Sequence, residues 1–104
     1  MKPKGRPRKY RIVKKEPKIL RFSPRGKPGR PDEIEIKMEE FEALRLADYL
    51  SLRQADSAKS MHVSQPTFSR ILRKARKALS EAFIDGKIIR IHGGAYSSPR
   101  DSHS

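Results

Sequence analysis

The sequence predicts a mainly α-helical domain, related to the winged-helix folds, in which three helices include a helix-turn-helix and two or three short β-strands flank them. Two short amphipathic segments meet at a tight turn over residues 61–64. The second segment keeps apolar residues at i, i+3 and i+4 spacing for four turns, which indicates a helix. Three other stretches, 19–22, 34–37 and 88–92, alternate apolar and polar residues as strands do.

The two ends of the chain differ in composition from its centre. Residues 1–17 combine prolines and glycine with many Lys and Arg side chains. Such a segment cannot bury enough apolar area to offset the entropy lost on ordering. We therefore expect a flexible basic arm over 1–17, a single domain over 18–92, and a disordered tail over 93–104.

A first helix is expected at about 39–50. Its apolar side chains cover most of its circumference, so other elements should pack on several of its sides and it should act as the scaffold. Glu39, Glu40 and Glu42 fall in its first turn, where negative charge suits the helix dipole. We expect this plain role for them rather than catalysis or metal binding.

Two further helices form the predicted helix-turn-helix. Ser51 and Gln54 have the spacing of a capping box, which predicts a helix over about 52–61. Ser64 is placed to cap the next helix, over about 65–83. Ala58 is small enough to sit where the two helices cross. His62 stands in the turn where glycine is common, and histidine reaches the required positive φ at modest cost.

Charge is distributed unevenly along the chain. The formal net charge is +13, and residues 1–30 alone hold 13 basic residues and one acidic residue. Residues 31–50 hold two basic and seven acidic residues, whereas residues 51–80 hold seven basic and one acidic residue. A balance this basic, concentrated on the arm and the helix-turn-helix, indicates a polyanionic partner, most often nucleic acid.

The apolar stripe of the last helix leaves basic side chains on roughly its opposite face. A helix presented in this way fits the major groove of DNA, where its first residues contact bases. The candidate base contacts are Ser64, Gln65, Thr67, Ser69 and Arg70. The candidate phosphate contacts are Arg73, Lys74 and Lys77.

The arm carries a second signal. Its sequence KPKGRPRK is similar to an AT-hook, which lies extended in the narrow minor groove of A·T-rich DNA. The plainer interpretation is a basic tail that contacts phosphates without regard to sequence. Either way, the candidate contacts of the arm are Lys4, Arg6, Arg8 and Lys9.

Several classes of function find no support in the sequence. The chain has no cysteine, and its three histidines are far apart, so we expect no metal and no other cofactor. No phosphate loop, catalytic triad or pair of catalytic carboxylates can be assembled, and we expect no enzyme. No apolar run approaches the roughly 18 residues of a membrane-spanning helix, so we expect a cytoplasmic protein without a membrane partner.

The stretch EALRLAD, followed by VSQPTFSRIL, resembles a family of small, largely uncharacterised prokaryotic proteins predicted to bind DNA. The resemblance spans roughly residues 4–95, including GRPRK near the start and IRIHGG near the end. It implies a helix-turn-helix similar to region 4 of sigma-70 factors, with a recognition helix that begins at Ser64-Gln65. It also implies a regulatory role without catalysis. The N-terminal cysteines common in relatives are absent here, so no metal role carries over.

We therefore expect a DNA-binding protein, and more specifically a sequence-specific transcriptional regulator. One helix reads few base pairs, so a homodimer is expected, with the strand at 88–92 as a candidate dimer edge. Two alternatives stay open. The first is a sigma-like module that docks on RNA polymerase through acidic residues 32–48. The second is an RNA-binding or ribosome-associated basic protein.

Overall fold

The computed structural model describes residues 11–26, 28–94 and 96–97. Over this part of the chain, three α-helices and several short strands are present, and helices account for roughly half of the residues. The coarse prediction of a small domain with three helices and short strands is confirmed. The elements are β1 (Arg11–Ile12), β2 (Arg21–Phe22), β3 (Glu33–Ile36), α1 (Met38–Leu44), the π-helical turn η1 (Arg45–Tyr49), α2 (Gln54–Met61), α3 (Gln65–Asp85), β4 (Ile88–Ile91) and β5 (Tyr96–Ser97).

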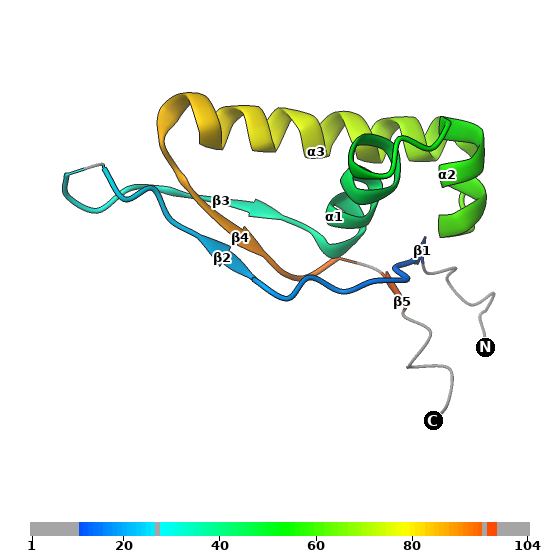
Figure 1. The fold of residues 1–104 in the computed structure, drawn as a ribbon, viewed down its shortest axis with the longest axis horizontal. Helices are drawn as coiled ribbons and strands as arrows, with labels where there is room; N and C mark the ends of the chain where they lie inside the picture. The colour runs from blue at the N-terminus through cyan, green and yellow to red at the C-terminus, as the bar shows by residue number, and fades with distance from the viewer. Residues whose placement is uncertain (1–10, 27, 95, 98–104) are drawn as a thin grey trace, which may run out of the picture.

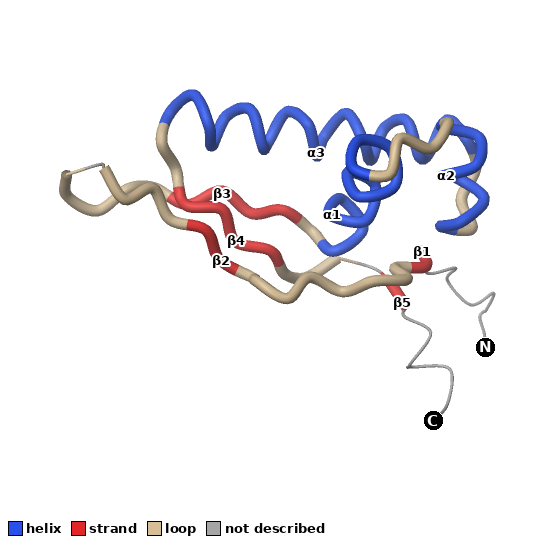
Figure 2. The backbone as a smooth tube through the Cα atoms, in the orientation of Figure 1, coloured by secondary structure: helices blue, strands red, loops and turns tan. Residues whose placement is uncertain are grey.

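The long helix α3 lies over a three-stranded sheet, and α1 and α2 pack against its N-terminal half (Figures 1 and 2). The strand order is β2-β4-β3, with β4 antiparallel to β2 and parallel to β3. The expectation that strand 88–92 supplies a dimer edge is wrong, because β4 has a hydrogen-bonded partner on both sides. The free edges of this sheet belong to β2 and β3.

The hydrophobic core lies where the three helices meet. The apolar stripe predicted for α3 faces inward, and each Leu- or Phe-sized side chain buried there contributes about 1.5–3 kcal/mol. Leu44, Ala47 and Val63 pack against the core from its margin. The core residues are Ala43, Leu46, Ala58, Met61, Phe68, Ile71 and Leu72.

The helix expected over 39–50 has the predicted extent but not a uniform geometry. After Leu44 it continues as the π-helical turn η1. The hydrogen bond that defines this turn runs from the Leu50 N–H to the Arg45 carbonyl, at 2.8 Å. At its start, the Glu40 side chain accepts from the Lys37 N–H at 2.9 Å, which supplies the cap that Lys37 itself lacks. Periodicity alone cannot distinguish the π-helical turn from a continued α-helix.

The predicted capping box at Ser51 is wrong. Ser51 adopts the left-handed conformation, with φ 60°, and α2 begins later, at Gln54, with Arg53 as the extended residue before it. The reason lies in the preceding helix, whose Leu46 carbonyl accepts from the Leu52 N–H at 3.0 Å. This contact folds the linker back over the end of η1 and delays the start of α2.

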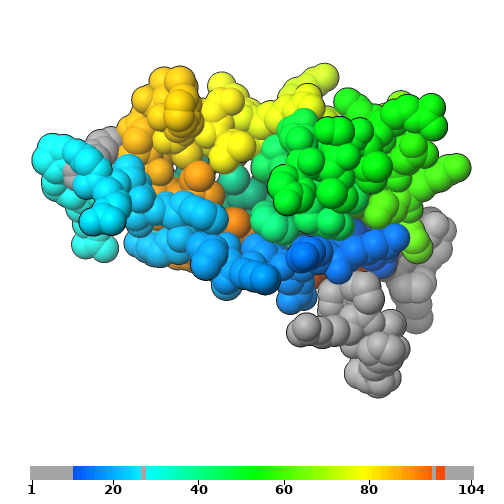
Figure 3. All heavy atoms as spheres, viewed as in Figure 1, coloured from blue at the N-terminus to red at the C-terminus, as the bar shows by residue number. Residues whose placement is uncertain are grey.

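The domain begins earlier in the chain than residue 18. Residues 11–12 form β1, which pairs in parallel with β5, and Val13 is fully buried. Figure 3 shows the blue N-terminal segment lying along the domain beneath α1. The boundary therefore moves from Lys18 to Arg11, and residues 96–97 belong to the domain rather than to the tail. Residues 1–10 and 98–104 lie outside the described residues.

Candidate functional site

The connection between α2 and α3 has the geometry expected from the sequence. His62 ends α2 in the left-handed conformation, with φ 57° and ψ 44°, and the Val63 N–H donates to the Ala58 carbonyl at 3.0 Å. Ser64 is extended, and its Oγ accepts from the Thr67 N–H at 3.2 Å, so it caps α3 as predicted. Ala58 is only 3% exposed, and its small side chain leaves room for the two helices to approach closely. We call residues 54–85 the α2–α3 unit.

Four basic side chains of α3 lie on the side away from the core. Arg70, Arg73, Lys74 and Lys77 are exposed, whereas Phe68, Ile71, Leu72 and Ala75 of the same turns are buried. We call these four residues the open face. Within the described part of the chain, neither Arg73 nor Lys74 forms an ion pair with an acidic side chain.

The first turn of α3 carries a small polar network. Thr67 Oγ1 accepts from Ser64 Oγ at 2.9 Å and from Arg70 Nη2 at 3.2 Å. Gln65 beside it is exposed, and Ser69 is half-buried. The network brings Ser64, Thr67 and Arg70 together at the start of the helix, where Ser64 and Arg70 are exposed.

Arg76 is a basic residue of α3 that takes no part in the open face. Its guanidinium donates to both carboxylate oxygens of Asp48 in η1, at 2.7 and 3.1 Å. The hydrogen bond from Arg76 lowers the pKa of Asp48 below its ordinary value. No local pattern indicates this pair, because its members are 28 positions apart. The pair distinguishes Arg76, whose charge is already bound, from the basic residues of the open face.

Lys77 has an acidic neighbour on its own helix. Glu81 lies one turn further along and pairs with Lys87 at 2.6 Å. The hydrogen bond from Lys87, with a smaller contribution from Lys77, lowers the pKa of Glu81. Lys77 is therefore the residue of the open face that lies beside an acidic side chain, Glu81.

Much of the acidic stretch that precedes α2 is engaged elsewhere. On the sheet, Glu33 pairs with Arg21 at 3.2 Å and with Arg90 at 3.6 Å, and Glu35 pairs with His92. None of these contacts involves the open face. Its cations are thus not neutralised by the strand carboxylates.

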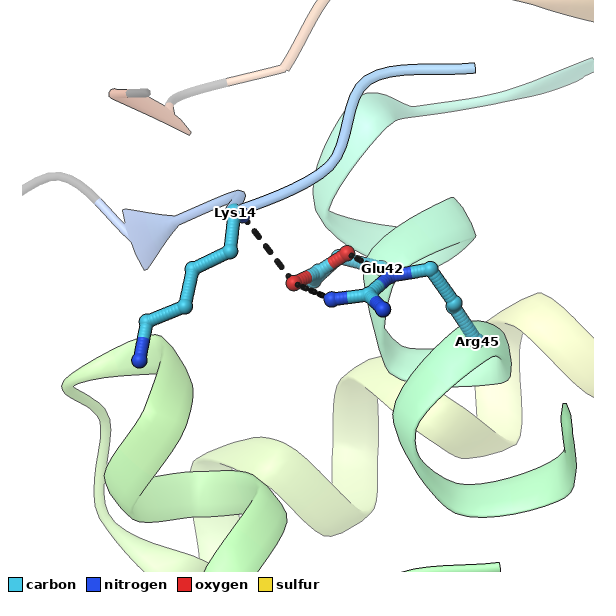
Figure 4. A network of polar contacts seen from close by, with 3 residues as sticks. All are labelled: Lys14, Glu42 and Arg45. Carbon is cyan, nitrogen blue, oxygen red and sulfur yellow. Dashed lines mark hydrogen bonds and ion pairs between the residues drawn. The ribbon is translucent and has the colours of Figure 1, made fainter. Parts of the chain in front are cut away.

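Glu42 fastens the N-terminal segment to α1 (Figure 4). Its side chain is fully buried and accepts two hydrogen bonds from the Arg45 guanidinium, both at 2.8 Å. It also accepts from the Lys14 backbone N–H at 3.0 Å. Because a hydrogen bond to a charged group is worth about 1.5–3 kcal/mol, the contact with the Lys14 N–H holds residue 14 against α1. Glu42 was expected only to favour the helix dipole. We call its contacts with Arg45 and Lys14 the Glu42 clamp, and the sequence could not predict the clamp because Lys14 is 28 positions away.

The arm residues Lys4, Arg6, Arg8 and Lys9 lie outside the described residues. The described chain begins at Arg11, in β1, and β1 contacts α2. The root of the arm is therefore beside the α2–α3 unit.

No helix in the described ranges has both the length and the apolar character needed to cross a membrane. In the same ranges, the His, Asp and Glu side chains do not gather in groups of three or more that could hold a metal ion.

Comparison with known proteins identifies relatives along most of the chain. A family model described as "Protein of unknown function DUF134" matches residues 1–99. A UPF0251 protein of Syntrophomonas wolfei is 49% identical over 87 residues, which cover 83% of this chain and 67% of the relative. A UPF0251 protein of Thermoanaerobacter pseudethanolicus is 45% identical over 92 residues, which cover 88% of this chain and 78% of the relative. A UPF0251 protein of Methanococcus vannielii is 44% identical over 94 residues, which cover 89% of this chain and 72% of the relative. No solved structure matches the chain.

Proposed function

The chain belongs to this DUF134 family, and we propose that it is a DNA-binding protein of the cytoplasm that regulates transcription by recognising a specific sequence. The proposal rests above all on the open face of α3. Exposed cations on a helix that a short turn and a shared core hold rigidly are what a major-groove reader needs. Two features support it, the tight connection at His62 and the net charge of +13.

In the proposed complex, the α2–α3 unit acts as a helix-turn-helix similar to region 4 of sigma-70 factors. The start of α3 enters the major groove, where Arg pairs with guanine and Gln with adenine. Ser64, Gln65, Thr67, Ser69 and Arg70 face the bases. Arg73, Lys74 and Lys77 contact phosphates, which supply most of the affinity.

The arm adds to the same interface. Because its root lies beside α2, Lys4, Arg6, Arg8 and Lys9 can reach the duplex that α3 contacts. They supply phosphate contacts or enter the adjacent minor groove. No step in this proposal requires catalysis, a metal or another cofactor.

The charge distribution favours DNA over a docking role on RNA polymerase through acidic residues 32–48. Glu33, Glu35, Glu42 and Asp48 of that stretch all pair with side chains of this chain. An acidic surface for a partner would need them free. Phe22, Tyr49 and Phe83 are exposed, but none of these three belongs to the open face, so they are not combined with its cations as stacking aromatics and basic side chains are in single-stranded RNA readers.

Selection of bound duplexes from a random pool tests the proposal. We expect one enriched motif for the natural chain. Arg70→Ala should relax the preference at one position of it, at a cost of about 1–3 kcal/mol. Arg76→Ala is the matched control, because Arg76 lies on the same helix but binds Asp48, and it should keep the motif. A pool without any enriched sequence would contradict sequence-specific binding.

A further inference from the structure

A broad apolar groove lies away from the open face. It runs between residues 15–24, the α1–η1 helix and the C-terminal half of α3, and consists of two adjoining hollows of ≈ 790 and ≈ 620 Å³. Phe22 and Leu79 line both hollows, so the groove is continuous. Figure 3 shows this hollowed surface between α1 and the C-terminal half of α3.

The side chains of the groove are unusually exposed for their type. Phe83 is 84% exposed and Tyr49 is 81% exposed, while Phe22 is 50% exposed. Since a fully exposed aromatic side chain presents about 200 Å², these three residues alone leave about 400 Å² in water. Ile19, Leu50 and Leu79 enlarge the apolar area further. A continuous patch of this size on a small protein marks an interaction surface.

Residues 1–10 and 98–104 carry little apolar surface that could fill the groove. The first segment has only Met1 and Tyr10 besides its prolines, and the second has none beyond Pro99. A second molecule can bring the apolar surface that these two segments lack. A standard interface buries about 800 Å² per partner, and the groove with its polar rim offers an area of that order.

We propose that this groove is the interface between two copies of the chain. The charges of the groove favour a self-complementary contact, because the exposed residues Lys15, Glu16 and Lys18 follow one another closely in its lining. In a two-fold interface each surface meets its own copy, so a lining that carries both signs can pair with itself. Charges of one sign alone would instead repel.

The position of the groove also suits the proposed function, on which this step rests. Phe83 lies 13 residues beyond Arg70 on α3, which is about 20 Å along a helix. Two copies joined near Phe83 would hold their reading faces up to about 40 Å apart. Half-sites one turn of DNA apart are separated by about 34–36 Å, so the dimer can span two successive major grooves.

Sedimentation equilibrium of the full chain without DNA tests the interface. The natural protein should approach twice its 12.0 kDa mass as its concentration rises. Phe83→Asp should stay monomeric, with an unchanged circular dichroism spectrum because residue 83 contributes little to the folded monomer. Ile84→Asp is the matched control, since Ile84 is 74% exposed on the same turn but does not line the groove, and it should still dimerise.

A natural protein that remains monomeric at every concentration would overturn the proposal and assign the groove to a different protein. It would also be overturned if both substitutions, or neither, abolished the dimer. These outcomes are independent of DNA binding. Failure of the duplex selection would leave the dimer intact, whereas a monomer that still enriches one half-site motif would refute only the interface.

Discussion

Replacing Arg73, Lys74 and Lys77 together by Gln removes three positive charges from the open face of α3. All three side chains are exposed, and none belongs to the core, so the fold should be unaffected. If each contacts a phosphate, the variant releases three fewer counterions on binding. The expected result is therefore a weaker dependence of affinity on salt, together with weaker binding overall.

The size of this effect follows from counterion release. Each phosphate contact contributes about 0.9 to the slope of log affinity against log salt, so three contacts contribute about 2.7. Between about 50 and 200 mM salt, the affinity of the natural protein should then fall about 40-fold more than the affinity of the variant. Fluorescence anisotropy with a labelled duplex, titrated at several salt concentrations, measures both slopes.

The matched control removes three charges that already have partners. Arg21, Arg76 and Arg90 pair with acidic side chains on the sheet and η1, and their combined replacement by Gln changes net charge by the same amount. Exposed pairs of this kind are worth less than about 1 kcal/mol each, so the control should fold and keep the natural slope. Equal slopes for the two triple variants would refute the assignment of the open face, because net charge alone would then explain binding.

Three further predictions concern the motif, the arm and an ion pair. Ala58→Leu should overpack the helix crossing and cost about 1–3 kcal/mol in a thermal melt, whereas Ala55→Leu on the exposed side of α2 should cost little. Deleting residues 1–10 should flatten the salt slope for every duplex, while the enriched motif persists. Because Arg76 lowers the pKa of Asp48, the pair stabilises the fold above the pKa of unfolded Asp, about 3.9. That stability should be lost as the pH falls through the folded value, and Asp48→Asn should remove this part of the acid dependence of the unfolding free energy.

Each of these three has a result that contradicts it. A natural melting curve for Ala58→Leu would mean that the helices do not cross at residue 58. An unchanged salt slope after the deletion would mean that the arm does not touch DNA. Denaturant titrations in which natural and Asp48→Asn proteins lose the same free energy on acidification would mean that the Asp48–Arg76 pair is not populated in solution.

The elements that the sequence predicted well are those set by local chemistry. The apolar period of α3 and the cap at Ser64 each depend on residues within one or two turns. The positive φ of His62 follows from the tight connection between two helices that share a core. In the candidate site, the exposure of Arg70, Arg73, Lys74 and Lys77 follows from the same helical period.

What the sequence could not predict depends on contacts between distant residues. Val13 is buried, and its N–H donates to the Ser97 carbonyl at 2.9 Å. These two residues are 84 positions apart, so no local pattern predicts that they pair. Ser51 has the residue type of a helix cap, but its backbone is used to close the preceding helix. Likewise, Arg76 is indistinguishable in sequence from its basic neighbours until Asp48 lies beside it.

The two proposed surfaces depend on one another through α3. Residues 70–77 of this helix carry the cations of the open face, and the turns that follow carry Leu79 and Phe83 of the groove. Both therefore lie on a single helix of 21 residues, about 31 Å long, without an intervening hinge. The spacing between two reading faces in a dimer would then be set by helix geometry and not by a loop. The dimer would therefore select half-sites by their separation as well as by their sequence. Because the hydrogen bond from the Lys14 N–H to Glu42 attaches residue 14 to α1, the arm would also start from a defined point of the domain.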